Sequence, residues 1–383
     1  MSVEYMVELL KKLVSIDTTS HEHKNFDEIV KVVEEEAKRI GCVTERVVDR
    51  RGLPHLKITL PNAPREGKKV IFLTHYDVVP PGEGWTIDPF TPIIKEGKVY
   101  GRGASDDKSG IAAALTAFKE VIDEGLEPKI FPVLIVSGGE ETGESEEFYR
   151  SITGDIGVVL DSGPEGLFIG ASGVARLEVT VKGKQEHSAY PFKGKNAIYA
   201  AAKVVSFVEE FGKELERTVV SKYDAPEFYE KVPGRVSVTM IRGGVAPNVI
   251  PGECTLIIDR RTIPEERAKD AALDLKRRIE EFAKRHGIDV EIKIGPLMDA
   301  WATTDQHVIE TFKRILGDIL GREPKILVEL GGTDGAYLID RMPVVQFGAL
   351  RGDNNIHGPN EFVYIDDLVL VKEFVKRTVL TAI

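Results

Sequence analysis

Short apolar runs that alternate with helical patterns constrain the fold of this chain more than any other feature. Three of them, KKVIFLTHYD, IFPVLIVS and IGVVL, contain β-branched residues, and each either ends in an acidic residue or is followed at once by glycine or an acidic residue. Such runs are typical of strands buried on both faces of a sheet. Helical periodicity occurs at residues 2–15, at residues 24–40 and after Gly110. The alternation predicts an α/β fold with a mostly parallel sheet.

The pattern changes between residues 174 and 294. The segment ARLEVTVKGK alternates apolar and polar residues, as a strand with one solvent-exposed face does. It begins a β-α-β-β-α-β order, which is typical of small ferredoxin-like domains. After residue 295 the first pattern returns. We therefore expect a discontinuous α/β domain of residues 1–173 and 295–383, interrupted by an inserted α+β domain of residues 174–294.

Charge and composition exclude several classes of protein. The 383 residues include 51 Lys and Arg against 62 Asp and Glu, a net charge of −11, and no basic patch indicates a nucleic-acid partner. No apolar run approaches the roughly 18 residues needed to cross a membrane, and the charged N-terminus does not resemble a signal peptide. Cys42 and Cys254 match no metal or redox motif. We expect a cytoplasmic protein.

Acids and histidines follow the ends of the predicted strands. They are His75 and Asp77, Glu140 and Glu141, Asp161, and finally His357. In open α/β sheets, ligands bind beyond the carboxyl ends of the strands, so these distant residues could meet at one place. Sets of metal ligands that consist mainly of carboxylate oxygens, with a single imidazole per ion, suit zinc, manganese or cobalt.

Each of these positions also has a local explanation that needs no function. His75 and Asp77 could be solvated residues at a strand end, although their spacing puts both side chains on one face. Glu140 and Glu141 could belong to a solvated acidic loop; alternatively, one binds a metal ion and the other accepts a proton from water. Asp161 could simply cap a turn.

The segment YGRGASDDKSG carries two further adjacent acids, Asp106 and Asp107. They lie between a glycine-rich turn and the start of a helix, whose positive end favours ionised carboxylates. One of them could cap the helix while the other is solvated. Residue chemistry alone does not choose between the two acids.

In combination, HYDVVP, GRGASDDKSG, GGEETG, the strand-end Asp161 and IHGPNE resemble the dizinc metallopeptidases and deacylases. That family includes acetylornithine deacetylase, succinyl-diaminopimelate desuccinylase, aminoacylase and glutamate carboxypeptidase. The resemblance extends over essentially the whole chain in order. It implies a lid or dimerisation domain at the inserted segment, and a homodimer formed through it.

The resemblance also implies roles for individual residues at a centre of two divalent ions, zinc first and cobalt or manganese as alternatives. One ion would be held by His75, Asp106 and Asp161, and the other by Asp106, Glu141 and His357. Glu140 would be the general base and Asp77 would orient His75. The peptide bond after Asp106 is usually cis in the family.

Further residues are implied to contact the substrate. His187 of EHSAYP would reach across a dimer interface to stabilise the tetrahedral intermediate. Asn248, Arg261, Gly332 and Thr333 match positions that bind the substrate.

One position departs from the family pattern. Desuccinylases, acetylornithine deacetylases and aminoacylases typically carry a carboxylate-binding arginine where this chain has Ala336. Arg351 is a candidate replacement.

These features predict a metal-dependent hydrolase. It would cleave an amide bond of an N-acyl amino acid or a short peptide, using a metal-activated water and Glu140. The substrate would be a small molecule or peptide. Two alternatives are a non-catalytic relative that binds a small ligand or a partner, and a protein with one structural metal ion.

Overall fold

The computed structural model describes residues 2–226 and 228–383, and the chain divides into two compact units. The first unit comprises Met1–Ile169, Thr303–Leu327 and Tyr337–Ile383. The second comprises Gly170–Ala302 and Val328–Ala336. The chain therefore leaves the first unit and returns to it.

The main sheet is parallel in its centre and antiparallel at its edges. Its neighbouring strands are, in spatial order, β1 (Val43–Val48), β2 (Pro54–Thr59), β6 (Phe131–Ser137), β3 (Lys69–His75), β7 (Ile156–Val159), β19 (Val344–Gln346) and β8 (Gly166–Ala171). The pairs β6–β3, β3–β7 and β7–β19 are parallel. The predicted α/β class with a largely parallel sheet is confirmed.

Helices with apolar stripes cover this sheet. They are α1 (Ser2–Val14), α2 (Phe26–Arg39), α3 (Lys108–Asp123), the short α4 (Glu146–Ser151), α7 (Gln306–Leu320) and α8 (Ile365–Val379). In α1, Met6, Leu9, Leu10 and Leu13 follow helical spacing and are buried. The alanine-rich α3 is buried along most of its length and packs against α1 and α8. This packing holds its first residues, which adjoin Asp106, in a fixed position.

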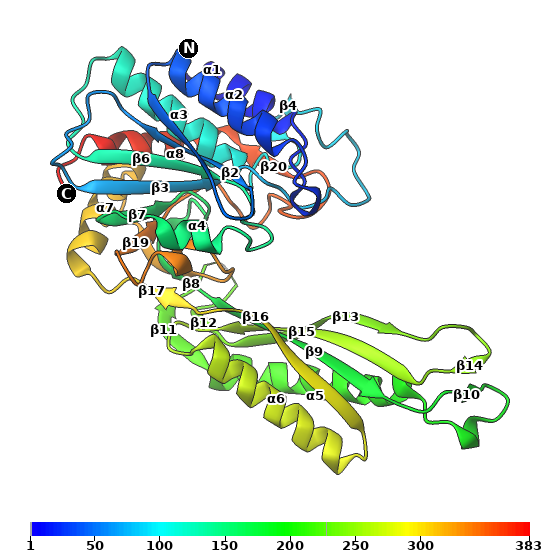
Figure 1. Ribbon diagram of the computed structural model, residues 1–383. Helices are drawn as coiled ribbons and strands as arrows, with labels where there is room; N and C mark the ends of the chain where they lie inside the picture. Colours follow the sequence, from blue (N-terminus) through cyan, green and yellow to red (C-terminus); the bar gives the residue numbers. More distant parts are fainter. Residues whose placement is uncertain (1, 227) are drawn as a thin grey trace. The chain divides into compact units, whose positions relative to one another are not determined.

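The second unit contains an antiparallel sheet with two long helices on one face (Figure 1). The helices are α5 (Ala197–Thr218) and α6 (Ala268–Arg285), and the strands are, in spatial order, β13 (Arg235–Gly243), β15 (Glu253–Thr262), β9 (Gly173–Lys182) and β16 (Asp289–Met298). Alternate strand residues such as Leu177, Val179 and Leu256 pack under the helices. The chain order of the elements is the predicted β-α-β-β-α-β order of a ferredoxin-like domain.

Shorter strands complete both units. They are β4 (Ile93–Lys95), β5 (Lys98–Tyr100), β10 (Glu186–His187), β11 (Val220–Asp224), β12 (Lys231–Pro233), β14 (Val249–Ile250), β17 (Trp301–Ala302), β18 (Lys325–Glu329) and β20 (Phe362–Tyr364). Strands β11 and β12 pair with each other, and Glu227, which lies between them in the sequence, is outside the described residues. Among the described residues, no helix combines the length and apolar character that a membrane crossing requires.

Candidate metal centre

The central parallel strands end at one edge of the main sheet. His75 is the last residue of β3 and lies opposite Ser137 of β6. Val159, the last residue of β7, pairs with Leu73 and with Gln346 of β19. Because the strands are parallel and in this register, the segments that follow them leave the sheet on the same side. Those segments carry the candidate ligands.

Two groups of possible ligands meet beyond this edge and share Asp106. One group is His75, Asp106 and Asp161; the other is Asp106, Glu141 and His357. Within each group the ligand atoms lie within 4.8 Å of one another. His75 Nε2 is 3.0 Å from Asp106 Oδ1, and His357 Nε2 is 3.1 Å from Asp106 Oδ2. The two oxygens of one carboxylate therefore face two different imidazoles.

The two adjacent acids differ in role. Asp107 is the N-cap of α3. Its carboxylate accepts a hydrogen bond from the backbone N–H of Gly110 and another, at 3.4 Å, from the backbone N–H of His75. It is fully buried, so it is a structural residue of the helix start and of the β3 end. Asp106 instead points to the histidines. The Asp106–Asp107 peptide bond is cis, as the family resemblance implies.

A tight turn places Asp106, and Gly103 is needed within it. Gly103 has a φ of +82°, and a Cβ atom there would lie 2.7 Å from Cγ1 of Val78. A larger residue would therefore be both strained and sterically blocked.

Glu361 fixes the same turn from the other end of the chain. Its carboxylate accepts hydrogen bonds from the backbone N–H groups of Gly103, Ser105 and Asp106, at 2.9–3.1 Å. It also forms a 2.6 Å ion pair with Arg102, and both side chains are buried. Sequence reasoning missed Glu361 although it belongs to IHGPNE. Five acids already had implied roles near the metal ions, and no local pattern distinguishes an acid that binds backbone N–H groups.

Asp77 connects two strand ends. Its main-chain oxygen lies 3.0 Å from His75 Nδ1, and its carboxylate oxygen Oδ1 lies 3.6 Å from the same atom. The carboxylate also accepts from the N–H groups of Glu140 and Glu141, both at 3.2 Å. Asp77 therefore positions the glutamate pair as well as the imidazole.

The side chains at this edge carry interacting charges. Burial opposes a charged imidazole, but bonds to Asp106 and Asp161 raise the pKa of His75 well above its usual value. Bonds to Asp106 and Glu141 raise the pKa of His357 to about 10. Burial, reinforced by the charge of Asp106, raises the pKa of Glu141 to about 7 and also raises that of Asp161. Carboxylates crowded in this way repel one another unless cations lie between them.

The donor set fits two divalent ions. Each group supplies one imidazole and two carboxylates, a combination that zinc, cobalt and manganese accept. Oδ1 of Asp161 is buried and has no hydrogen-bond partner among the described residues, so it has an unused lone pair at the centre. His357 has a left-handed φ of 62°, a conformation that non-glycine residues seldom adopt and that is common at functional sites.

The residues expected to bind substrate lie in the second unit. His187 in β10 is exposed and pairs with Val249 of β14. Asn248 precedes Val249, and its backbone oxygen accepts a hydrogen bond from the backbone N–H of Ser188. Arg261 lies in β15. Gly332 and Thr333 lie in the loop after β18, and Oγ1 of Thr333 is buried without a hydrogen-bond partner in the part of the chain that the structure describes.

Arg351, the candidate replacement for an arginine at position 336, has an acidic partner within the first unit. It forms a two-pronged ion pair with Asp367, with N–O distances of 2.5 and 2.7 Å, and Asp367 is buried. Its donors are already used in the first unit, which explains its presence without a ligand.

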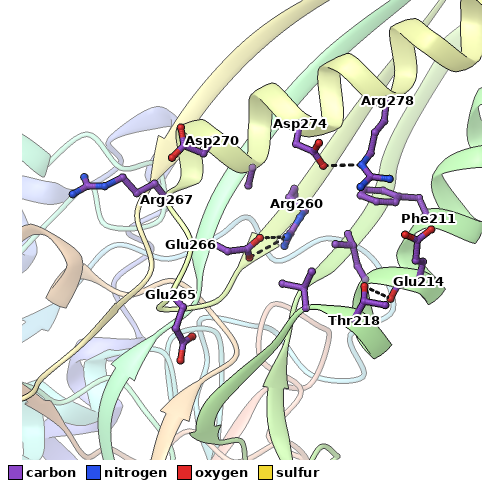
Figure 2. A pocket seen from close by; sticks show the side chains of 13 residues that line it. Phe211, Glu214, Thr218, Arg260, Glu265, Glu266, Arg267, Asp270, Asp274 and Arg278 are labelled. Atoms are coloured by element: carbon purple, nitrogen blue, oxygen red, sulfur yellow. Dashed lines mark hydrogen bonds and ion pairs between the residues drawn. The ribbon is translucent and has the colours of Figure 1, made fainter.

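The second unit also contains a cavity of about 450 Å³ beside α5 and α6. Arg260 on its wall forms a two-pronged pair with Glu266, and Arg278 pairs with Asp274 (Figure 2). These charges compensate one another. The lining contains no histidine and no member of the two ligand groups at the strand ends, so the cavity is not the candidate centre.

Comparison with known proteins identifies relatives along most of the chain. The succinyl-diaminopimelate desuccinylase of Nitrosomonas eutropha is 30% identical over 337 residues, covering 82% of this chain and 83% of the relative. An uncharacterised metallohydrolase of Methanocaldococcus jannaschii is 28% identical, covering 85% and 84%. A metallo-carboxypeptidase of Sulfolobus solfataricus has the same fold, with a TM-score of 0.78, 19% identity and 98% coverage of both chains.

The profile of peptidase family M20/M25/M40 matches residues 71–381, a range that contains every candidate ligand of both groups. The chain therefore belongs to this family of peptidases and is a metal-dependent hydrolase of amide bonds.

Proposed function

We propose that this protein hydrolyses the amide bond of an N-acyl amino acid or a short peptide, with Glu140 as the general base. The observation that carries this proposal is the position of Glu140 next to both ligand groups. Its Oε2 atom lies 3.9 Å from His75 Nε2, and the adjacent Glu141 contacts His357 at 3.2 Å. The Glu140 side chain is 18% exposed, so a substrate and water can reach it.

The two divalent ions, held by His75, Asp106 and Asp161 and by Asp106, Glu141 and His357, would polarise the amide carbonyl and lower the pKa of a water molecule. Glu140 accepts the proton of that water and later donates it to the leaving amine. Asp77 keeps Glu140 in place through the hydrogen bond to its backbone N–H. Zinc is the proposed ion, with cobalt and manganese as alternatives, because the same donors suit all three.

We propose further that the second unit, expected from the sequence at residues 174–294, is a lid and dimerisation domain. Its edge strand β13 exposes Met240 by 42% and Ile241 by 54%, and the following Val245 is 80% exposed. Tyr199 of α5 is also 72% exposed. An edge strand with an apolar surface is suited to pairing with a second copy. A homodimer would allow His187, exposed in the same unit, to act on the substrate of its partner.

A cytoplasmic location is part of this proposal. Both cysteines are buried and unpaired, as in proteins of reducing compartments. The non-catalytic alternative has no supporting observation, because none of the proposed ligands and bases is missing from the strand ends.

Replacing Glu140 with alanine tests the reaction. We expect the Glu140→Ala variant to bind two metal ions per chain and to lose turnover by about 10²- to 10⁴-fold, the usual contribution of a general base. Turnover of N-acyl amino acids and dipeptides would be measured with added zinc, cobalt or manganese. Glu146→Ala, an exposed acid in α4, is the matched control. Near-normal turnover by Glu140→Ala would rule out this mechanism.

A further inference from the structure

One buried asparagine connects the turn that carries Asp106 with the loop that carries His357. Asn354 lies just before His357 in the sequence, and its side chain is fully buried. Its Nδ2 donates to Ser105 Oγ at 2.9 Å and to the backbone oxygen of Ala349 at 3.2 Å. Ser105 directly precedes Asp106 and is also fully buried. The bond to Ser105 therefore links two segments that are 249 positions apart in the sequence.

The surroundings determine which way the Asn354 amide points. The backbone oxygen of Ala349 can only accept a hydrogen bond, so the NH2 group must face it. The amide oxygen Oδ1 is buried and has no hydrogen-bond partner in the described part of the chain. A buried acceptor without a partner costs stability. This amide therefore contributes through its two N–H donors.

Ala349 is a fixed point for one of these donors. It follows β19, and the next residue, Leu350, donates a backbone hydrogen bond to Ser162 at 2.9 Å. Ser162 directly follows Asp161, a proposed ligand of the ion that His75 also binds. Through Ala349 and Ser105, the asparagine is thus connected to the segments that present two carboxylates of the centre.

The loop that Asn354 begins has an unusual backbone. Asn355 and His357 have left-handed φ values of 54° and 62°. Non-glycine residues in this region are strained, and they keep the conformation only where the surrounding contacts enforce it. Asn354 supplies such contacts at the start of the loop. Further along, Nη2 of the buried Arg102 donates to the backbone oxygen of Gly358 at 3.1 Å.

We propose that Asn354 is a positioning residue of the metal centre and sets the place of His357 relative to Asp106. Nε2 of His357 lies 3.1 Å from Oδ2 of Asp106, and both belong to the ligand group that includes Glu141. The His357 side chain is 53% exposed, whereas no other proposed ligand side chain is more than 14% exposed. Packing therefore holds this imidazole less firmly than the other ligands, and the link through Asn354 and Ser105 compensates for it.

Zinc binding tests the proposal without a substrate. The inference rests on the two-ion centre of the proposed function, so isothermal titration would compare metal-free wild type with Asn354→Ala. We expect one of the two zinc affinities to fall by about ten- to a hundredfold, the usual effect of losing a residue that orients a metal ligand. Ser105→Ala should lower the same affinity less, because Ala349 keeps its donor, and it provides the test if Asn354→Ala does not fold. Asn62→Ala, an exposed asparagine after β2, is the control and should change neither affinity.

A second background separates positioning from a general structural defect. If Asn354 acts through His357, then Asn354→Ala should cause no further loss of zinc affinity in a protein that already carries His357→Ala. The visible absorption spectrum of the cobalt-loaded protein reports ligand geometry, and it should change for Asn354→Ala but not for Asn62→Ala. Melting temperatures would show that each variant is folded.

Unchanged zinc affinity in Asn354→Ala or in Ser105→Ala would overturn this inference alone. A further loss of affinity in the His357→Ala background would overturn it as well. A wild-type protein that binds two ions but hydrolyses no amide would instead reject the proposed function and leave the role of Asn354 in place. A wild-type protein that binds a single ion would reject both.

Discussion

The carboxylate of Glu361 accepts a hydrogen bond from the backbone N–H of Asp106 at 3.1 Å, although the two residues are 255 positions apart. The same carboxylate binds Gly103 and Ser105, so it shapes the turn that presents Asp106. We expect Glu361→Gln to weaken metal binding by about ten- to a hundredfold, as changes to residues that orient metal ligands do. Calorimetric titration with zinc would measure this loss.

The same substitution leaves Arg102 buried without its acid, which should cost about 3–5 kcal/mol of stability. The double variant Arg102→Met/Glu361→Gln removes both charges and should recover much of that stability. It should not recover metal affinity, because the carboxylate that binds the turn is still missing. Full recovery of both properties would contradict a positioning role for Glu361.

Asp106 and Asp107 should respond differently to substitution. Asp106→Asn should disrupt both metal sites, since one carboxylate faces both histidines, but it should not lower the melting temperature of the metal-free protein. Asp107→Ala should lower stability by about 1–2 kcal/mol through loss of the helix cap. Asp123→Ala, at the exposed end of α3, is a control for both. Metal analysis and thermal unfolding would separate the two effects, and equal metal loss in both variants would refute the distinction.

Glu120 should give the protein resistance to acid. It forms ion pairs with Lys372 and Lys376 of α8, at 2.7 and 2.9 Å. Burial opposes its charge, but the bond to Lys372 and further bonds lower the pKa of Glu120 to about 2. A carboxylate with a lowered pKa stabilises the fold above its unfolded pKa of about 4.5, and this stabilisation is lost as the pH falls toward 2.

Glu120→Gln should therefore reduce stability at neutral pH by about 1–3 kcal/mol and flatten the pH dependence between about 4.5 and 2. Urea unfolding at a series of pH values would detect both changes. The exposed pair of Glu209 with Lys213 provides the comparison, and Glu209→Gln should change stability by less than about 1 kcal/mol. If the free energy of unfolding varies with pH in the same way for the wild type and Glu120→Gln, the cluster of Glu120 with Lys372 and Lys376 does not contribute to acid resistance.

The proposed dimer can be tested on its edge strand. Ile241→Arg should produce monomers, because a charge would lie within the exposed apolar surface of β13. Leu297→Arg is the matched control, since Leu297 is similarly exposed on β16 at the opposite edge of the sheet. Analytical ultracentrifugation would give the mass of each. A wild-type protein that is monomeric and fully active would exclude the role proposed for His187 across the interface.

The strand ends that carry His75, Glu141 and Asp161 could be predicted because they depend on local patterns. Apolar runs define the strands, and the parallel register follows from the alternation with helices. Glu361 could not be predicted, because its partners are backbone groups more than 250 positions away. The different roles of Asp106 and Asp107 depend on a turn that the residue pattern does not determine.

The shared position of Asp106 between the two histidines also has a consequence during protein synthesis. His75 and Asp106 are 31 residues apart, but His357 is a further 251 residues along the chain. Closing so long a loop is slow, and a ribosome releases the N-terminal segments first. Until residues 357–361 emerge, the nascent chain lacks His357 and Glu361. A hydrolytic centre of this design therefore cannot be assembled before the segment that contains His357 and Glu361 has been synthesised.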